Sequence, residues 1–263
     1  MRNDAEKATS FGEVAASYDR VRPGPAPGAL NFLIPNGCSL ALDLAAGTGL
    51  FTRPLARLVP EVVAVEPDPR MREVLAVNSP GVTVLDGRGE AIPLPDSSAD
   101  AVFVSTAWHW LDPAVAVPEI ARVLRDGGRL GVLWTSRDRA EDWVVQLDLL
   151  RLPGIDPGTG SGGSRTVAEV REALNRDHEV TLPEGAPFGN VAVGSFGFTR
   201  TMRVDDVVDW LATNSALITA SPRDKEAGLA LCRAVLAERA DSQSRIEVPL
   251  RSWCWRADRL PRA

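Results

Sequence analysis

Cysteine and histidine are scarce in this chain of 263 residues. The three cysteines, Cys38, Cys232 and Cys254, are odd in number and far apart, a pattern that fits neither a disulfide framework nor a CxxC metal site. The two histidines, His109 and His178, stand in no cluster with metal-ligand spacing, so no bound metal is predicted. The thiols are interpreted as reduced, which favours a cytoplasmic protein.

Excess positive charge and long apolar runs are missing as well. The 29 basic residues are outnumbered by 35 acidic ones, for a net charge of −6, and such a chain lacks the positive field that collects nucleic-acid phosphates. Residues 1–7 contain no apolar segment typical of a secretory signal, and no stretch approaches the ~20 apolar residues that span a bilayer. Neither nucleic acid nor a membrane is therefore expected as a partner.

Short Val- and Leu-rich runs alternate with segments of helical character in the first half of the chain. The runs cover 40–45, 62–66, 82–85, 101–104 and 129–134, and helices are predicted over 51–59, 71–78 and 114–125, the last of them ended by Gly127 and Gly128. Continuous apolar runs suit strands that are covered on both faces. The alternation predicts an α/β fold with a doubly wound, Rossmann-like and mostly parallel sheet.

The second half of the chain has a different rhythm. A helix is predicted over 141–151, then a Gly-, Pro- and Ser-rich connector over 153–164, a helix that opens at Thr166 and another that starts at Ser221. Alternating stretches at 190–204 and 245–256 predict late strands, as an antiparallel pair at the sheet edge. The chain is thus divided into an N-terminal helical segment (1–34), a core (35–138) and a final part (139–263) whose cap helices and late strands complete the same domain.

The strongest local signal is a glycine-rich turn between a strand and a helix, LDLAAGTG at 42–49. Gly47 and Gly49 let the backbone turn sharply and let a ligand approach without meeting a Cβ atom. Glu66 ends the next strand, where an acid can accept hydrogen bonds from both ribose hydroxyls of an adenosine ligand. A tight turn that binds nothing is the alternative interpretation.

The spacing of the glycines distinguishes two kinds of adenosine ligand. A site for the diphosphate of a dinucleotide favours G-x-G-x-x-G, with the diphosphate at the helix N-terminus, whereas Thr52 occupies the third glycine position here. The turn therefore favours a ligand without a diphosphate, and an NAD(P)-dependent oxidoreductase is the rival enzyme class.

Several sequence blocks, in the same order, resemble the class I S-adenosylmethionine-dependent methyltransferases, and among them the type-11 domain family of small-molecule enzymes. Beside 42–49 these blocks are FGEVAASYDRVRP at 11–23, VEPD at 65–68, GRGEAIPLPD at 87–96, AWHWLD at 107–112 and RVLRDGGR at 122–129, where Asp126 replaces the family's usual proline. The block at 107–112 resembles the branch that includes trans-aconitate methyltransferase-like proteins. The resemblance implies a seven-stranded class I sheet, with the N-terminal segment over the cofactor site.

The resemblance also implies the cofactor and the residues that hold it. S-adenosylmethionine would bind and leave as S-adenosylhomocysteine, with Glu66 at the ribose, Glu90 and the backbone near Gly89 at the adenine, and Thr106 to Trp108 facing the sulfonium. The complete set of implied cofactor-binding residues is Tyr18, Arg22, Asp43, Ala45, Gly47, Thr48, Gly49, Glu66, Pro67, Gly89, Glu90, Thr106 and Trp108.

Catalysis of methyl transfer needs alignment and exclusion of water more than a dedicated set of reacting groups. His109 is a candidate base that could remove a proton from the acceptor, and Tyr18 is a second candidate at the reacting centre. Five tryptophans near the expected acceptor pocket favour a small organic acceptor with apolar area: Trp108, Trp110, Trp134, Trp143 and Trp210. A cofactor-binding scaffold without turnover is the remaining alternative, and the sequence indicates no oligomeric state.

Overall fold

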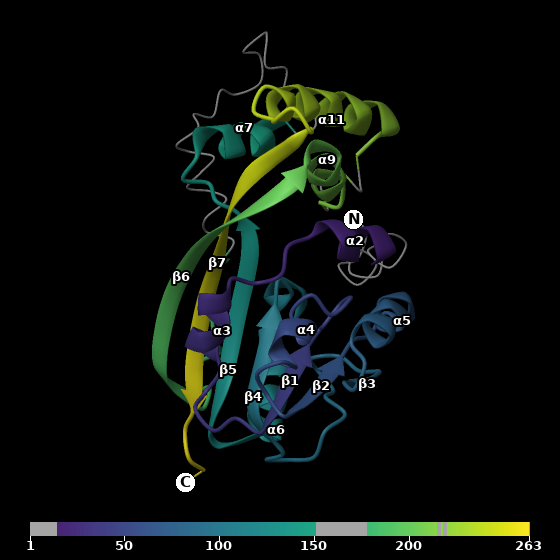
Figure 1. Cartoon of the computed structure of the whole chain (residues 1–263). Helices are drawn as coiled ribbons and strands as arrows, with labels where there is room; N and C mark the ends of the chain where they lie inside the picture. Colours follow the sequence, from purple (N-terminus) through teal and green to yellow (C-terminus); the bar gives the residue numbers. More distant parts are fainter. Residues whose placement is uncertain (1–14, 151–177, 215–216, 218–219, 263) are drawn as a thin grey trace. The chain divides into compact units, whose positions relative to one another are not determined.

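The computed structural model describes residues 15–150, 178–214, 217 and 220–262, drawn in colour in Figure 1. The chain separates into two compact units. Unit 1 consists of Met1–Thr135, Val180–Phe196 and Ser252–Ala263, and unit 2 consists of Ser136–Glu179 and Gly197–Arg251. Three of the four junctions between the units along the chain, at 135/136, 196/197 and 251/252, fall inside strands.

Seven strands form that sheet, in the order β3-β2-β1-β4-β5-β7-β6. Their bounds are β1 Leu40–Leu44, β2 Glu61–Val65, β3 Thr83–Leu85, β4 Ala99–Ser105, β5 Leu124–Arg137, β6 Phe188–Arg203 and β7 Arg245–Arg259. The first five strands pair in parallel, and β7 is antiparallel. This is the seven-stranded class I arrangement, which confirms the predicted fold.

Helices lie before and between the strands. Those of unit 1 are α2 Ala15–Val21, α3 Pro27–Leu33, α4 Thr52–Leu55, α5 Pro69–Asn78, the 3₁₀ helix η2 Trp108–Trp110 and α6 Pro113–Val123. Those of unit 2 are α7 Asp142–Leu150, α9 Val204–Ala212 and α11 Pro222–Ala237. Over the described residues, no helix is long and apolar enough to cross a membrane.

The central strands are buried on both faces because their neighbours on the two sides are different helices. Along β4, Val102 and Val104 pack into a cluster with Ile120 of α6, while the ring of Phe103 stacks edge-on against Phe51, beside α4, at 5.5 Å. Successive side chains of a strand point to opposite faces, so an uninterrupted apolar run is what such a strand requires. This is why the Val- and Leu-rich runs predicted the strands.

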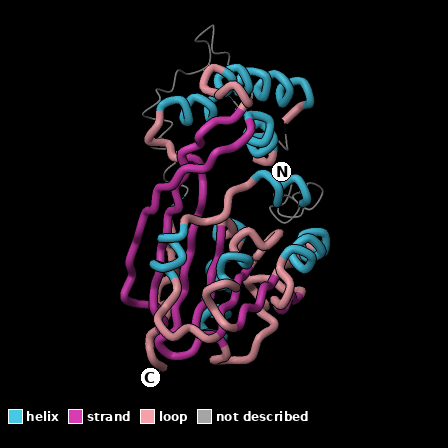
Figure 2. Tube along the Cα trace, in the orientation of Figure 1, coloured by secondary structure: helices cyan, strands magenta, loops and turns pink. Residues whose placement is uncertain are grey.

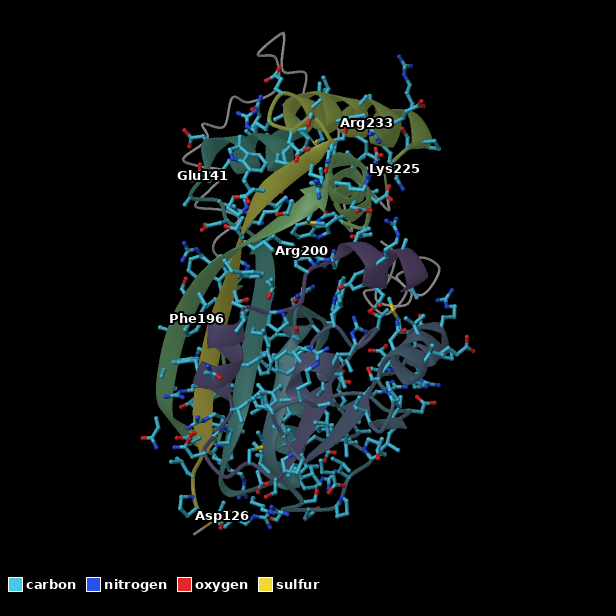
Figure 3. All side chains as sticks on the ribbon, viewed as in Figure 1. Asp126, Glu141, Phe196, Arg200, Lys225 and Arg233 are labelled. Atoms are coloured by element: carbon cyan, nitrogen blue, oxygen red, sulfur yellow. The ribbon has the colours of Figure 1, made fainter. Side chains whose placement is uncertain are left out.

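The segment 1–34, which the sequence predicts to be helical, contains helix α3 in addition to α2. Pro27 starts α3, because proline is compatible with the first helical position. Phe32 of α3 packs against Phe196 of β6 at 5.7 Å between ring centroids, and the guanidinium of Arg256 in β7 lies 4.3 Å from the Phe32 ring centroid. Figure 1 shows α3 lying along these strands, and Figure 3 labels Phe196.

The predicted end of the helix over 114–125 is wrong. Helix α6 ends at Val123, and Leu124 already has extended backbone angles and pairs with Ala99 of β4. Gly127, with φ of +76°, therefore bends the start of β5, where the register with β4 shifts, and does not end a helix. Asp126 at this bend pairs with Arg259 of β7.

In unit 2, helix α11 packs against both α7 and α9, and the three helices appear as a cyan group in Figure 2. A buried carboxylate connects α7 to the end of β5. Asp148 of α7, which is 1% exposed, accepts hydrogen bonds from Arg137 (2.6 Å) and Arg139 (2.9 Å). The guanidinium of Arg137 also lies 4.6 Å from the ring centroid of Trp210 in α9. Such a pair is costly to break from one side, because a buried charge would lose its partner.

The predicted helix start at Ser221 is confirmed, since its hydroxyl caps α11 by accepting a hydrogen bond from the backbone nitrogen of Asp224 at 3.2 Å. The predicted connector at 153–164 and the helix opening at Thr166 lie outside the described residues.

Candidate functional site

The turn that follows β1 is built from residues with left-handed backbone. Ala45, Gly47 and Gly49 have φ values of +56°, +58° and +87°, a region that side chains with a Cβ atom rarely adopt. Within the turn the nitrogen of Gly49 donates to the carbonyl of Ala46 at 3.0 Å. The chain thereby reverses sharply at the carboxyl end of β1, where ligands of doubly wound sheets bind.

The two glycines have different surroundings. A Cβ atom on Gly47 would meet no atom within 4 Å, whereas one on Gly49 would lie 2.5 Å from Cδ1 of Leu75 and 2.9 Å from the hydroxyl of Ser79. Gly49 is therefore required for packing against α5. Gly47 instead faces open space, and this is where a ligand can come close to the backbone.

Glu66 lies directly after β2 and is buried, with 7% of its surface exposed. Its Oε2 accepts a hydrogen bond from the nitrogen of Gly47 at 2.8 Å, and its Oε1 accepts one from the nitrogen of Asp68 at 2.9 Å. Burial raises the pKa of this carboxyl, and the two backbone hydrogen bonds oppose the rise. Because a carboxylate can accept about four hydrogen bonds, acceptor positions remain on both oxygens.

Asp43 is fully buried inside β1, on the sheet face that carries α4. Its Oδ2 accepts a hydrogen bond from the hydroxyl of Thr52 at 2.5 Å. Among the described residues, Oδ1 of Asp43 and the hydroxyl of Thr48 have no hydrogen-bond partner although both are buried. Burial raises the pKa of Asp43 to about 7, and the nearby charge of Glu66 adds to the rise. Two polar groups beside the glycine turn are thus left for something other than the described protein atoms to satisfy.

Tyr18 and Arg22 lie on and directly after α2. The guanidinium of Arg22 is 4.4 Å from the centroid of the Tyr18 ring. A Cβ atom on Gly24 would lie 3.3 Å from the carbonyl of Leu50, so the chain that leaves α2 runs close to the end of the glycine turn. The structure therefore places this N-terminal segment beside the turn, within unit 1.

The loops after β3 and β4 hold the other predicted residues. Glu90 accepts a hydrogen bond from the nitrogen of Asp112 at 3.1 Å, which links the two loops. Thr106 has a φ of +57°, and its nitrogen donates to the carbonyl of Leu133 at 2.7 Å. Trp108 is buried, whereas His109 is exposed and its ring lies 4.6 Å from that of Trp110.

All thirteen predicted cofactor-binding residues and His109 belong to unit 1. Most of them follow the carboxyl ends of β1, β2, β3 and β4. Among these, Pro67 is exposed between Glu66 and Asp68, and Gly89 is buried against the side chain of Leu111. Of the five tryptophans, Trp143 and Trp210 belong to unit 2. Among the described residues, no group of His, Cys, Asp or Glu could hold a metal ion.

Comparisons with known proteins assign this sequence to a family. A family model described as a methyltransferase domain matches residues 42–132. An uncharacterized methyltransferase of Mycobacterium tuberculosis is 39% identical over 232 residues, which cover 88% of this chain and 87% of the relative. An uncharacterized methyltransferase-like protein of Schizosaccharomyces pombe is 36% identical over 222 residues, or 82% of each chain.

A solved structure extends the match in fold. A putative type II methyltransferase from Anaeromyxobacter dehalogenans superposes with a TM-score of 0.66 at 21% sequence identity, over 92% of this chain and 99% of that chain. At this level of identity the superposition shows the fold alone.

The chain belongs to the class I S-adenosylmethionine-dependent methyltransferases with a type-11 methyltransferase domain. It is a methyltransferase, and its cofactor is S-adenosylmethionine. The residues fit that cofactor on three observations: the open space beside Gly47, the remaining acceptor positions of Glu66, and the unsatisfied buried groups of Asp43 and Thr48.

Proposed function

We propose that this methyltransferase methylates a small organic acceptor and binds its cofactor beside Gly47 and Glu66, on the open side of the glycine turn. The observation that carries the proposal is the 2.8 Å hydrogen bond from the Gly47 nitrogen to Glu66, next to space that a Cβ atom on Gly47 would enter. A carboxylate fixed in this way is oriented before the ligand arrives, so little ordering remains to be done on binding.

S-adenosylmethionine supplies an electrophilic methyl group on a sulfonium, which a nucleophile displaces in line to leave S-adenosylhomocysteine. In our proposal Glu66 accepts hydrogen bonds from the two ribose hydroxyls, and the backbone of Gly47, Thr48 and Gly49 lines the ribose and methionine portion. Ala45, at φ of +56°, shapes the entrance to the turn.

The polar ends of the cofactor are assigned to side chains that carry the matching chemistry. Asp43 helps to position the amino end, because a carboxyl with a pKa of about 7 can accept or donate a hydrogen bond near neutral pH. Arg22 pairs with the cofactor carboxylate, and Tyr18 shields the reacting centre with its ring. Thr48 contributes a hydroxyl that is buried and unsatisfied within the described part of the chain.

The adenine and the sulfonium are assigned to the loops after the next strands. Pro67 and the backbone at Gly89, with Glu90, border the adenine, and the link from Glu90 to the Asp112 nitrogen keeps this border together with the η2 loop. Thr106 and Trp108 face the sulfonium, where an aromatic ring contributes about 0.5–2 kcal/mol to binding of a cation.

The acceptor is proposed to be a small organic molecule with apolar area, because buried Trp108 and half-buried Trp110 follow β4 at the carboxyl edge of the sheet. His109 is the proposed base, since it is exposed beside Trp110 and imidazole is the side chain most often used as a general base. The sequence block at 107–112 supports a place in the branch of trans-aconitate methyltransferase-like proteins.

One relative has a named acceptor: a malonyl-[acyl-carrier protein] O-methyltransferase of Methylococcus capsulatus is 34% identical over 145 residues, 46% of this chain and 48% of the relative. Carboxyl oxygen is therefore one acceptor atom to include in a search. The proposed organisation keeps 1–34 over the cofactor and assigns 139–263 to the acceptor side.

Calorimetry with purified protein tests the proposal. Saturable binding of S-adenosylmethionine and S-adenosylhomocysteine is expected, with no heat from nicotinamide dinucleotides; the reverse result contradicts the site assignment. Incubation with radiolabelled S-adenosylmethionine and fractionated small-molecule extract should then label a low-molecular-mass product. Tight cofactor binding without any labelled product would favour a scaffold without turnover.

A further inference from the structure

Asp19, on helix α2, joins three elements of unit 1 through one carboxylate. Its Oδ1 accepts a hydrogen bond from Nη2 of Arg53 in α4 at 2.9 Å, and its Oδ2 accepts one from Nδ2 of Asn78 at the end of α5 at 3.0 Å. These two hydrogen bonds tie α2 to both α4 and α5, and they add to the packing of its buried residues Ala15 and Val21.

Arg53 continues this connection into the glycine turn. While Nη2 binds Asp19, Nη1 of Arg53 donates a hydrogen bond to the carbonyl of Thr48 at 3.0 Å. A guanidinium can hold two partners in fixed directions at once, which a lysine ammonium on a flexible stem does not reproduce. The turn and α2 are therefore connected through a single planar group.

The ion pair between Arg53 and Asp19 is partly buried. The side chains of Arg53 and Asp19 are 25% and 16% exposed, so solvent screens this pair less than a fully exposed ion pair. Charge-assisted hydrogen bonds of this kind are stronger than those between neutral groups. The neighbours of Asp19 on and after α2 are Tyr18 and Arg22, the residues proposed to lie over the cofactor.

We propose that Asp19 and Arg53 are positioning residues, which hold α2 and the Thr48 carbonyl in the cofactor-binding arrangement without touching the cofactor themselves. The inference rests on the proposed cofactor site. Loss of either side chain should therefore weaken the binding of S-adenosylmethionine and of S-adenosylhomocysteine to the same extent. The two ligands differ only in the methyl group and the charge at sulfur, and the positioned surface binds the parts that they share.

The test compares Asp19→Ala, Arg53→Ala, the double variant and Arg53→Lys by calorimetry with both ligands. Each single variant should weaken both ligands about tenfold, the loss expected for a charge-assisted hydrogen bond. The double variant should lose less affinity than the sum of the two single losses, because both substitutions remove the same pair, and Arg53→Lys should not restore affinity. Asp205→Ala is the matched control, because Asp205 pairs with Arg233 of α11 on the exposed surface of unit 2, where Figure 3 labels Arg233.

Hydrogen exchange on the same variants gives a readout that needs no ligand. In Asp19→Ala, the amide of Arg22, which donates to the Tyr18 carbonyl at 3.2 Å, should exchange faster, while the amides of β1 stay protected. Affinity within twofold of wild type, additive losses in the double variant, or a loss confined to S-adenosylmethionine would each overturn the positioning role. Wild-type protein that binds neither ligand would instead refute the proposed cofactor site. Even then, unchanged exchange of the Arg22 amide in Asp19→Ala would refute the role of Asp19 in holding α2.

Discussion

The backbone nitrogen of Gly47 and the carboxylate of Glu66 are joined by a hydrogen bond of 2.8 Å. Glu66 thus fixes the turn after β1 from the end of β2, in addition to any contact it makes with a ligand. Substitutions at either residue should therefore change binding through both effects.

Glu66→Gln should weaken S-adenosylmethionine by about 10- to 100-fold, or about 1.5–3 kcal/mol, because the charge is lost and one amide group must face a backbone N–H. Calorimetry measures the loss, and circular dichroism should show an unchanged fold. Glu61→Gln is the control, since Glu61 is exposed at the opposite end of the same strand. Equal affinities for Glu66→Gln and wild type would rule out the ribose role.

Gly47→Ala should mainly reduce ligand binding, whereas Gly49→Ala should mainly reduce stability. At Gly47 the added methyl group has space, so the stability cost is about 1–2 kcal/mol from the positive φ, while the methyl enters the proposed ligand space and abolishes most binding. At Gly49 the same strain is joined by overlap with Leu75 and Ser79, for a total of about 2–5 kcal/mol. Thermal melts and calorimetry separate the two; a larger stability loss at Gly47 would contradict the assignment.

Asp43→Asn should change the pH dependence of stability. Burial raises the pKa of Asp43 to about 7 from an ordinary 3.8, so between these values the native state holds a proton that the unfolded state has released. Wild-type stability should then fall as pH rises through this window, by up to about 1.4 kcal/mol per pH unit from this group alone.

The asparagine, which cannot titrate but still accepts a hydrogen bond from Thr52, removes that slope. Urea unfolding at pH 5 and pH 7 should show the variant gaining about 2–3 kcal/mol over wild type between the two values. Parallel curves for both proteins would mean that Asp43 titrates normally.

His109→Gln should lower kcat by about 100-fold if the acceptor is deprotonated during transfer, the usual contribution of a general base. The assay uses the labelled product of the acceptor search. A variant with wild-type rate from pH 5 to 9 would remove His109 from the mechanism.

Much of the fold was predictable because the central strands carry apolar residues on both faces, as Val102, Phe103 and Val104 do. The exact ends of elements were not. The glycines at 127 and 128 favoured a helix end near residue 125, but Leu124 pairs with Ala99 of β4 and already belongs to β5. Helix α3 was not predicted as a separate element, although Pro27 at its first position is a local signal for a helix start.

The candidate site shows the same division. Gly47, Glu66 and their neighbours could be found because the ligand demands those residue types at one turn. The Asp19–Arg53 pair could not, because its partners are 34 positions apart and neither element shows a pattern that links them. Asp19 does belong to the N-terminal block at 11–23, which carried the resemblance without revealing what its carboxylate holds.

The bend at the start of β5 has a consequence for how this fold can diversify. Leu124 pairs with Ala99 and Arg129 with Ala101, so β5 takes five steps where β4 takes two. Arg125, Asp126 and Gly127, which lie between these pairs, are exposed. An extra residue inserted here can be taken up by the irregular stretch, so that Leu130 and Val132 keep their places in the buried cluster. Length variation among relatives is therefore expected at this bend and not within the paired part of β5, where one added residue would turn every side chain to the other face.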